Sequence, residues 1–140
     1  MLEAAVNTLL LATSNPHKVD EVAASLGPLG WQICTLQDVA DGRALPEEPV
    51  EDAPDFEGNA AIKARAYAAW SGIPTLADDS GLVVDALGGA PGVHSARWSG
   101  VDGDRATRDA ANNKKLVQAL QSTPQAERSA RFVCVLCLAE

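Results

Sequence analysis

The sequence predicts an α/β fold in a single domain, residues 1–140. Short apolar runs of strand length recur along the chain, and the segments between them carry apolar residues at helical spacing. The chain has 140 residues, of which 46% are hydrophobic and 21% are charged. This composition is ordinary for a folded domain with its own core, and it argues against general disorder.

The first elements follow from a short apolar run and the residues after it. Thr8 to Ala12 is short and apolar, as a buried strand is. Asn15 is a favoured N-cap and Pro16 suits the first position of a helix, whose apolar residues then recur at helical spacing. Gly27 and Pro28 end this helix, and residues 31–36 are typical of a second strand.

The rest of the chain continues the alternation of strands and helices. An Ala-rich helix is expected after a long acidic connection, and Gly72 ends it. The expected elements, in order, are the connection 38–58, the helix 59–70, strands at 75–77 and 82–87 around an acidic turn, a Gly-rich loop 88–103, a helix 104–120 and a long apolar strand 130–139.

Charge and composition exclude several classes of function. Lys and Arg number 11 against 19 Asp and Glu, so the net charge is −8 and we expect no binding to nucleic acid or anionic membranes. No apolar run approaches the ~20 residues that span a bilayer. The N-terminus carries Glu3 and no basic region, so we expect no signal peptide.

The cysteines predict a reducing, cytoplasmic setting, because they are too few and odd in number for a disulfide framework. Cys134 and Cys137 form a C-x-x-C, which is typical of zinc or redox sites. They lie in a continuous apolar run, however, and positions three apart in a strand point to opposite faces. We therefore interpret both as structural residues.

The segment Thr13-Ser14-Asn15-Pro16-His17-Lys18 lies between the first strand and the first helix. Free N–H groups at the start of the helix, the hydroxyls of Thr13 and Ser14, and the ammonium of Lys18 can converge on one anion. This predicts a phosphate site, and the simpler alternative is a capped helix with a surface lysine. The glycines and the Gly-Lys-Thr ending of a P-loop are absent.

Asp78 and Asp79 are adjacent carboxylates, which we place at a strand end beside a turn at Gly81. If they were buried together they would repel each other, and they would need a cation, a hydrogen-bond network or solvent. Mg²⁺ meets this need because it takes one or two carboxylates and leaves positions for phosphate and water. The alternative is an acidic turn with Asp as a cap, and the motif alone does not decide between them.

Two further segments carry polar candidates. One carboxylate of the acidic connection could complete a metal site, among Glu47, Glu48, Glu51, Asp52, Asp55 and Glu57. In the helix that follows, Lys63 and Arg65 lie two apart and diverge, so at most one of them faces a site. In the Gly-rich loop, we interpret His94 as structural or exposed rather than as a general base, and Arg97 as the better charge contact.

Together these features indicate metal-assisted phosphoryl chemistry, with a divalent cation needed to bring a triphosphate to so acidic a chain. The same residues resemble the inosine triphosphate pyrophosphatases, the house-cleaning enzymes for noncanonical purine nucleotides. The matching segments are Leu11 to Lys18, Phe56 to Ala60 with Lys63-Ala64, Ala77 to Leu82, Leu87 to Gly92, Ser95 to Arg97, and Arg131-Phe132. Their order and spacing run over essentially the whole chain.

The resemblance implies Mg²⁺-dependent hydrolysis of ITP, dITP and XTP to the monophosphate and pyrophosphate. It implies that residues 13–18 bind the triphosphate, that Lys63 faces the phosphates and that Ser80 contacts the substrate. Asp79 matches the catalytic, metal-binding aspartate, and Glu51 aligns with a metal-ligand glutamate. The family fold is an elongated, two-lobed α/β structure with a mixed central sheet flanked by helices, usually in a homodimer.

The chain departs from the family pattern at its C-terminal end. Family members are longer, and their later part carries a Phe-Gly-Tyr-Asp motif, another lysine and a Ser-His-Arg motif that hold the base. We therefore expect the C-terminal part of the family domain to be missing, so that the strand 130–139 is left partly uncovered.

Three alternatives stand beside this hypothesis. A phosphoribosyltransferase needs a Thr-Gly phosphate loop soon after its aspartates, whereas the strand-like residues 82–84 follow here. A haloacid-dehalogenase-type phosphatase needs Asp-x-Asp, whereas Asp78 and Asp79 are adjacent. A catalytically impaired nucleotide-binding or dimerisation remnant belongs to another class of function, and an assay of ITP hydrolysis separates it from an enzyme.

Overall fold

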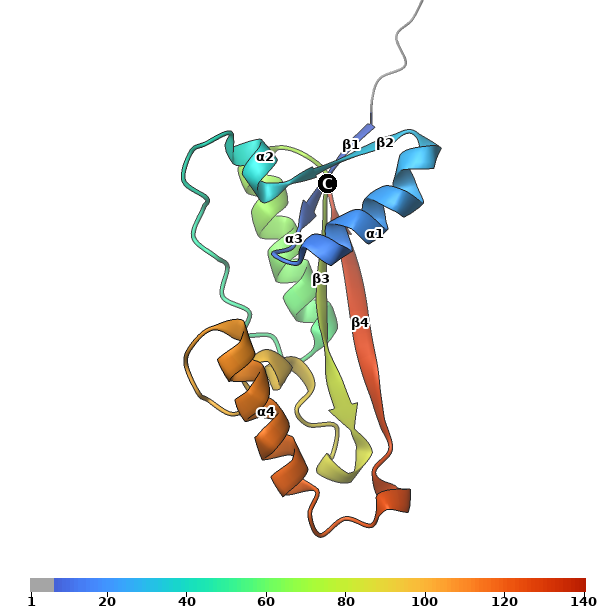
Figure 1. Ribbon diagram of the computed structural model, residues 1–140. Helices are drawn as coiled ribbons and strands as arrows, with labels where there is room; N and C mark the ends of the chain where they lie inside the picture. Colours follow the sequence, from blue (N-terminus) through green and yellow to red (C-terminus); the bar gives the residue numbers. More distant parts are fainter. Residues whose placement is uncertain (1–6) are drawn as a thin grey trace, which may run out of the picture. The chain divides into compact units, whose positions relative to one another are not determined.

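The computed structural model describes residues 7–140, which form four β-strands and four α-helices (Figure 1). The strands are β1 (Asn7–Ala12), β2 (Trp31–Thr35), β3 (Thr75–Val84) and β4 (Ala130–Ala139). The helices are α1 (Pro16–Leu26), α2 (Leu36–Ala40), α3 (Phe56–Ser71) and α4 (Arg105–Ala119). Glu3, on which the expectation of no signal peptide rests, lies outside the described residues.

The chain divides into two compact units. Unit 1 comprises residues 7–53, Glu57–Asp78 and Leu136–Glu140, and unit 2 comprises Pro54–Phe56 and Asp79–Val135. The sheet order is β2-β1-β3-β4, and β1 runs parallel to both β2 and β3. β3 passes from unit 1 into unit 2 and β4 returns, so these two neighbours run in opposite directions and the sheet is mixed, as predicted.

The core of unit 1 forms around β1, in which residues 9–12 are all buried. Because neighbouring strand residues point to opposite faces, β1 is covered on both sides, as is typical of a central parallel strand. On one face Leu10 and Ala12 pack with Ala64 and Tyr67 of α3. α1 packs against β2, and Figure 1 shows α1 and α3 flanking the sheet.

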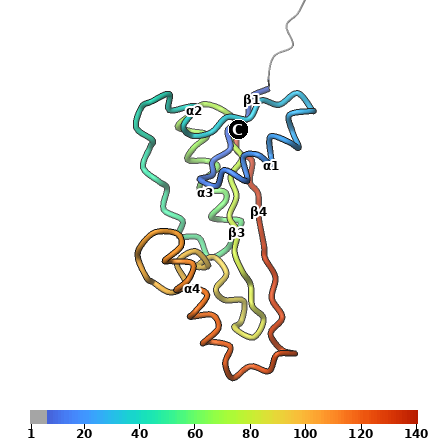
Figure 2. Tube along the Cα trace, in the orientation of Figure 1, coloured from blue at the N-terminus to red at the C-terminus, as the bar shows by residue number. Residues whose placement is uncertain are grey.

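α2 is an element that the sequence analysis does not predict. Residues 36–40 are assigned there to the end of a strand and to the acidic connection, but they form a short helix. Thr35 and Asp38 make a capping box, in which each side chain accepts a hydrogen bond from the other residue's backbone N–H, at 3.1 and 2.8 Å. The connection that follows α2 runs to α3 as an extended trace (Figure 2).

The two strands predicted around an acidic turn at residues 78–81 are wrong. β3 is one continuous strand, Thr75–Val84, and it runs through Asp78, Asp79 and Gly81. Residues 85–87 form a 3₁₀ turn rather than the end of a strand. Successive strand residues alternate between the two faces, so the strand separates the two carboxylates instead of placing them together at a turn.

In unit 2 the Gly-rich loop folds back along β3. The N–H of Gly89 donates to the Val84 carbonyl at 2.9 Å, and the N–H of Val84 donates to the Ala90 carbonyl at 3.2 Å. Gly89 has φ 94°, a left-handed conformation that glycine adopts at little cost. The loop then forms a 3₁₀ turn, Gly92–Arg97, against which α4 packs.

β4 confirms the predicted long apolar strand, and its exposure alternates along the chain. Phe132 is 86% exposed, and Leu136 and Leu138 are also exposed. Cys134 and Cys137 are three apart in this strand, where such positions point to opposite faces, and neither is in a disulfide. No helix in residues 7–140 has both the length and the apolar character needed to cross a membrane.

Candidate active site

The loop between β1 and α1 is closed by Asn15. Its backbone N–H donates to Thr13 Oγ1 at 3.1 Å, and its Oδ1 accepts from the His17 N–H at 3.0 Å. The N–H groups of Lys18 and Val19 donate to the Asn15 carbonyl at 3.1 and 3.4 Å. The predicted N-cap is therefore confirmed, but the N–H groups of the first turn are already engaged, which corrects the prediction that they are free for an anion. The hydroxyls and ammonium groups remain as the donors for a phosphate.

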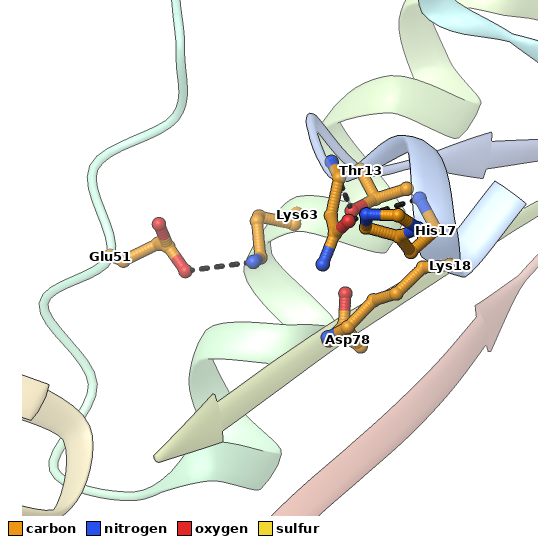
Figure 3. Close-up of polar contacts among 7 residues, drawn as sticks. Thr13, His17, Lys18, Glu51, Lys63 and Asp78 are labelled. Atoms are coloured by element: carbon orange, nitrogen blue, oxygen red, sulfur yellow. Dashed lines mark hydrogen bonds and ion pairs between the residues drawn. The ribbon is translucent and has the colours of Figure 1, made fainter. Parts of the chain in front are cut away.

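Lys18 and Asp78 form an ion pair at the start of α1 (Figure 3). The Asp78 side chain is 8% exposed and that of Lys18 is 30% exposed. β1 and β3 pair with Ala12 opposite Ala77, so Asp78 comes next to the loop that follows Ala12. The sequence predicts that Lys18 binds phosphate and leaves the role of Asp78 open, and the ion pair gives Asp78 a role in holding Lys18.

Lys63 and Glu51 form a second ion pair, with Lys63 Nζ 3.1 Å from Glu51 Oε1. Figure 3 shows Glu51 on the acidic connection and Lys63 on α3, with their side chains directed toward each other. Both side chains are partly exposed, so this pair can open when a ligand competes for either partner. Arg65 is exposed, in line with the prediction that at most one of the two helix cations faces a site.

A cavity of about 170 Å³ in unit 1 brings together four of the predicted residues, Thr13, Ser14, Glu51 and Lys63. Glu48 and Tyr67 also line it. Burial, and then the charges of Glu48 and Glu51, raise the pKa of the Tyr67 phenol, so the phenol stays protonated and able to donate. Tyr67 is not among the site residues predicted from the sequence, although its position four residues after Lys63 places it on the same face of the helix.

Asp79 and Ser80 follow Asp78 along β3 and belong to unit 2. Asp79 is half-buried and Ser80 is exposed. Asp78 and Asp79 are neighbours in a strand, and successive strand residues point to opposite faces. His94 is exposed, which agrees with its interpretation as a structural or surface residue, and Arg97 is exposed as well.

The oxygen donors around the cavity fit Mg²⁺ in chemical type. Carboxylates of Glu48 and Glu51 line it together with the hydroxyls of Thr13 and Ser14, and Mg²⁺ prefers such hard oxygen ligands. Across residues 7–140, no three or more His, Cys, Asp and Glu side chains are grouped so that they could hold a metal ion. Mg²⁺ commonly keeps waters and substrate phosphates as ligands, so a carboxylate-poor site is compatible with it.

Comparisons with known proteins identify the family that the chain resembles. The family model described as the Ham1 family matches residues 9–140. A dITP/XTP pyrophosphatase of an Exiguobacterium species is 48% identical over 132 residues, which are 94% of this chain and 62% of the relative. A dITP/XTP pyrophosphatase of Anaeromyxobacter dehalogenans is 42% identical over 153 residues, which are 94% of this chain and 64% of the relative.

Solved structures give the same result for the fold. A HAM1 protein from Coxiella burnetii matches with a TM-score of 0.80 and 36% identity, over 94% of this chain and 62% of that one. A nucleoside-triphosphatase, dITP/XTP pyrophosphatase, from Mycobacterium abscessus matches with a TM-score of 0.77 and 42% identity, over 94% and 64% of the two chains. The chain thus spans less than two thirds of the length of these relatives.

Proposed function

This chain belongs to the Ham1 family, and on that premise we propose that it hydrolyses ITP, dITP and XTP to the monophosphate and pyrophosphate with Mg²⁺. The observation that carries the proposal is the cavity of unit 1, which joins Thr13 and Ser14 of the predicted phosphate loop to Lys63 and Glu51. Two relatives of which this chain covers 62% and 64% are named dITP/XTP pyrophosphatases. Their name supports the substrate class.

The lysines and hydroxyls of unit 1 bind the triphosphate in this proposal. An ammonium group has three N–H donors, so Lys18 can keep its bond to Asp78 and still donate to a phosphate oxygen. Lys63 turns from Glu51 to the phosphates, and this exchange removes the Lys63 ammonium from the Glu51 carboxylate. The resemblance assigns Glu51 and Asp79 to Mg²⁺, which would supply charge neutralisation on the phosphate oxygens.

Asp79 provides the base in this proposal. Its carboxylate orients a water molecule and accepts a proton from it as the water attacks the α-phosphorus in line, and pyrophosphate is the leaving group. Ser80 donates a hydrogen bond to the substrate beside it. Positioning and charge neutralisation supply most of the rate in phosphoryl transfer, so the chain needs no covalent intermediate.

The assembly and the compartment are part of the same proposal. The family resemblance favours a homodimer, and the small, odd number of cysteines favours a reducing compartment such as the cytoplasm. Light scattering of the purified chain tests the dimer directly.

The test of the function is pyrophosphate release from ITP, dITP, XTP and ATP, each with Mg²⁺ and with a chelator. We expect release from the three noncanonical substrates that stops when the metal is removed. Lys63→Ala should lower kcat/KM by roughly tenfold or more, because it removes a charge from the phosphates. Arg65→Ala is the matched control on the same helix and should leave kcat/KM unchanged. A chain that binds these nucleotides and releases no pyrophosphate would be the impaired remnant instead.

A further inference from the structure

The hydroxyl of Ser95 ties the 3₁₀ turn of unit 2 to strand β3. Ser95 Oγ accepts a hydrogen bond from the Leu82 N–H at 2.9 Å and donates one to the Gly92 carbonyl at 2.6 Å. One hydroxyl therefore closes its own turn and holds the strand backbone at Leu82. Leu82 lies three residues after Asp79 and two after Ser80, the residues to which the proposed chemistry assigns the base and a substrate contact.

The turn sits directly on the backbone of β3 at Gly81. A Cβ atom at this position would lie 2.4 Å from the Gly92 oxygen, 2.6 Å from Ser95 Oγ and 3.0 Å from Phe56 Cε1. Two of these distances are far below van der Waals contact, and one of the opposing atoms belongs to the backbone, which cannot turn aside. Glycine is required at position 81 because the turn packs directly against the strand backbone there. The absence of a side chain on Gly81 lets the Ser95 hydroxyl reach the strand.

The turn is itself fixed by α4. Asn112 Nδ2 donates to the carbonyls of Ser95 and Ala96, each at 3.1 Å. Asn112 Oδ1 accepts from the Ser99 N–H at 2.8 Å. Val83 also forms an antiparallel bridge with Pro91. The Ser95 hydroxyl therefore reaches β3 from a turn that a helix holds in place.

We infer that Ser95 is a positioning residue, which fixes the backbone of β3 so that the Asp79 carboxylate and the Ser80 hydroxyl keep the orientation needed for attack. The inference rests on the proposed function of Asp79. Side-chain direction in a strand follows the backbone, and a misplacement of about 1 Å can cost roughly 100-fold in rate. Ser95 itself has no contact with substrate in this scheme.

The test compares Ser95→Ala with Ser99→Ala by two readouts. Ser99 is a matched control, since its hydroxyl lies in the same loop and accepts only from the Val101 N–H, at 3.1 Å. In Ser95→Ala we expect amide hydrogen exchange at Leu82 to quicken by roughly tenfold or more. We expect kcat on ITP to fall by roughly 10- to 100-fold with KM nearly unchanged. Ser95→Thr, which keeps the hydroxyl, should restore both readouts, and Ser99→Ala should change neither.

The outcomes separate the inference from the function on which it rests. Faster exchange at Leu82 with unchanged kcat in an active chain overturns the positioning role and leaves the proposed function standing. If the unsubstituted chain proves inactive, the exchange measurement still decides whether Ser95 holds the strand. Equal exchange in Ser95→Ala and Ser99→Ala overturns the inference in either case. If Ser95→Ala does not fold, Asn112→Ala is used instead, because it removes the hydrogen bonds that hold the turn on α4. Amide exchange at Leu82 and kcat on ITP are then measured and interpreted as for Ser95→Ala.

Discussion

The ammonium of Lys18 and the carboxylate of Asp78 join the start of α1 to strand β3, across a sequence separation of 60 residues. A buried carboxylate is costly unless a cation compensates it, and Lys18 provides that compensation at the point where β1 ends. The Lys18–Asp78 ion pair distinguishes Asp78 from its neighbour Asp79. Asp78 pairs with Lys18, a residue of the proposed phosphate loop, whereas the proposed function assigns the chemistry to Asp79.

Removing the charge of Lys18 should destabilise the fold. In Lys18→Met the buried carboxylate of Asp78 loses its cation, and we expect the free energy of unfolding to fall by about 1–3 kcal/mol. Arg105→Met is the control, because Arg105 forms an exposed ion pair with Asp109, at 3.8 Å, and should change stability by less than about 0.5 kcal/mol. Urea titration measures the free energy of unfolding of both variants. Equal losses in Lys18→Met and Arg105→Met would mean that the Lys18–Asp78 pair stabilises the fold no more than a surface ion pair does.

Asp79→Asn should lower turnover of ITP by about 100-fold or more, because the amide cannot accept the proton of the attacking water. The substitution keeps the size of the side chain, so the thermal unfolding curve should stay close to that of the unsubstituted chain. Steady-state kinetics with saturating Mg²⁺ measures the change. An Asp79→Asn variant with undiminished Mg²⁺-dependent turnover would remove Asp79 from the mechanism.

The elements that the sequence predicts well are those with local signals. The N-cap Asn15 with Pro16 places the start of α1 correctly, because the cap depends on nearby residues. α2 is missed because the capping box of Thr35 and Asp38 lies in a segment that reads as a strand followed by a loop. The apolar character of that segment does not distinguish a short helix from the end of a strand.

The candidate site residues also fall into two groups, those that the sequence predicts and those that depend on contacts between distant segments. Sequence and family resemblance point to Thr13, Ser14, Glu51 and Lys63, and these four line one cavity. The continuity of β3 is not visible in the sequence, because an acidic pair followed by glycine is typical of a turn. In the structure the backbone of Gly92 approaches β3 so closely at Gly81 that only glycine fits there. This contact joins segments that are distant in the sequence, so the local sequence pattern does not reveal it. The ion pair of Asp78 depends on strand register for the same reason.

Glu51→Gln should weaken the apparent affinity for Mg²⁺. The amide carries no charge, so it binds the cation less well, and we expect the Mg²⁺ concentration for half-maximal activity to rise roughly tenfold or more. Glu47→Gln is the control, because Glu47 is exposed and does not line the cavity. A titration of activity against Mg²⁺ at saturating ITP measures both variants. If the two curves coincide, Glu51 is only the ion-pair partner of Lys63.

Acid should remove a stabilising contribution of Asp104. Its side chain accepts the Thr107 N–H at 2.8 Å, and this hydrogen bond lowers the pKa of Asp104 below its ordinary value of 3.8. A lowered pKa in the folded state means that the contribution is present above about pH 4 and is lost as the pH falls through the folded value. Asp104→Asn keeps a capping side chain that does not titrate. The difference in free energy of unfolding between the unsubstituted chain and Asp104→Asn, measured with urea, should therefore stay constant from pH 7 to 5 and shrink below pH 4. A difference that grows in acid would contradict this prediction.

Strand β4 should mediate self-association. Among residues 7–140 it lies at the edge of the sheet, and an edge strand with unpaired backbone groups and apolar side chains is a template for another chain. Phe132 is its most exposed large residue, at 86%. Phe132→Lys should raise the dissociation constant by roughly tenfold or more, since burying a phenylalanine side chain contributes about 1.5–3 kcal/mol.

The matched control is Val117→Lys, because Val117 is 63% exposed but lies on α4, which presents no strand edge. Size-exclusion chromatography with light scattering over a concentration series measures the association of all three proteins. We expect the unsubstituted chain and Val117→Lys to associate alike, and Phe132→Lys to remain monomeric to higher concentration. If the unsubstituted chain is monomeric throughout, or if both lysine variants behave alike, the edge of β4 is not the contact.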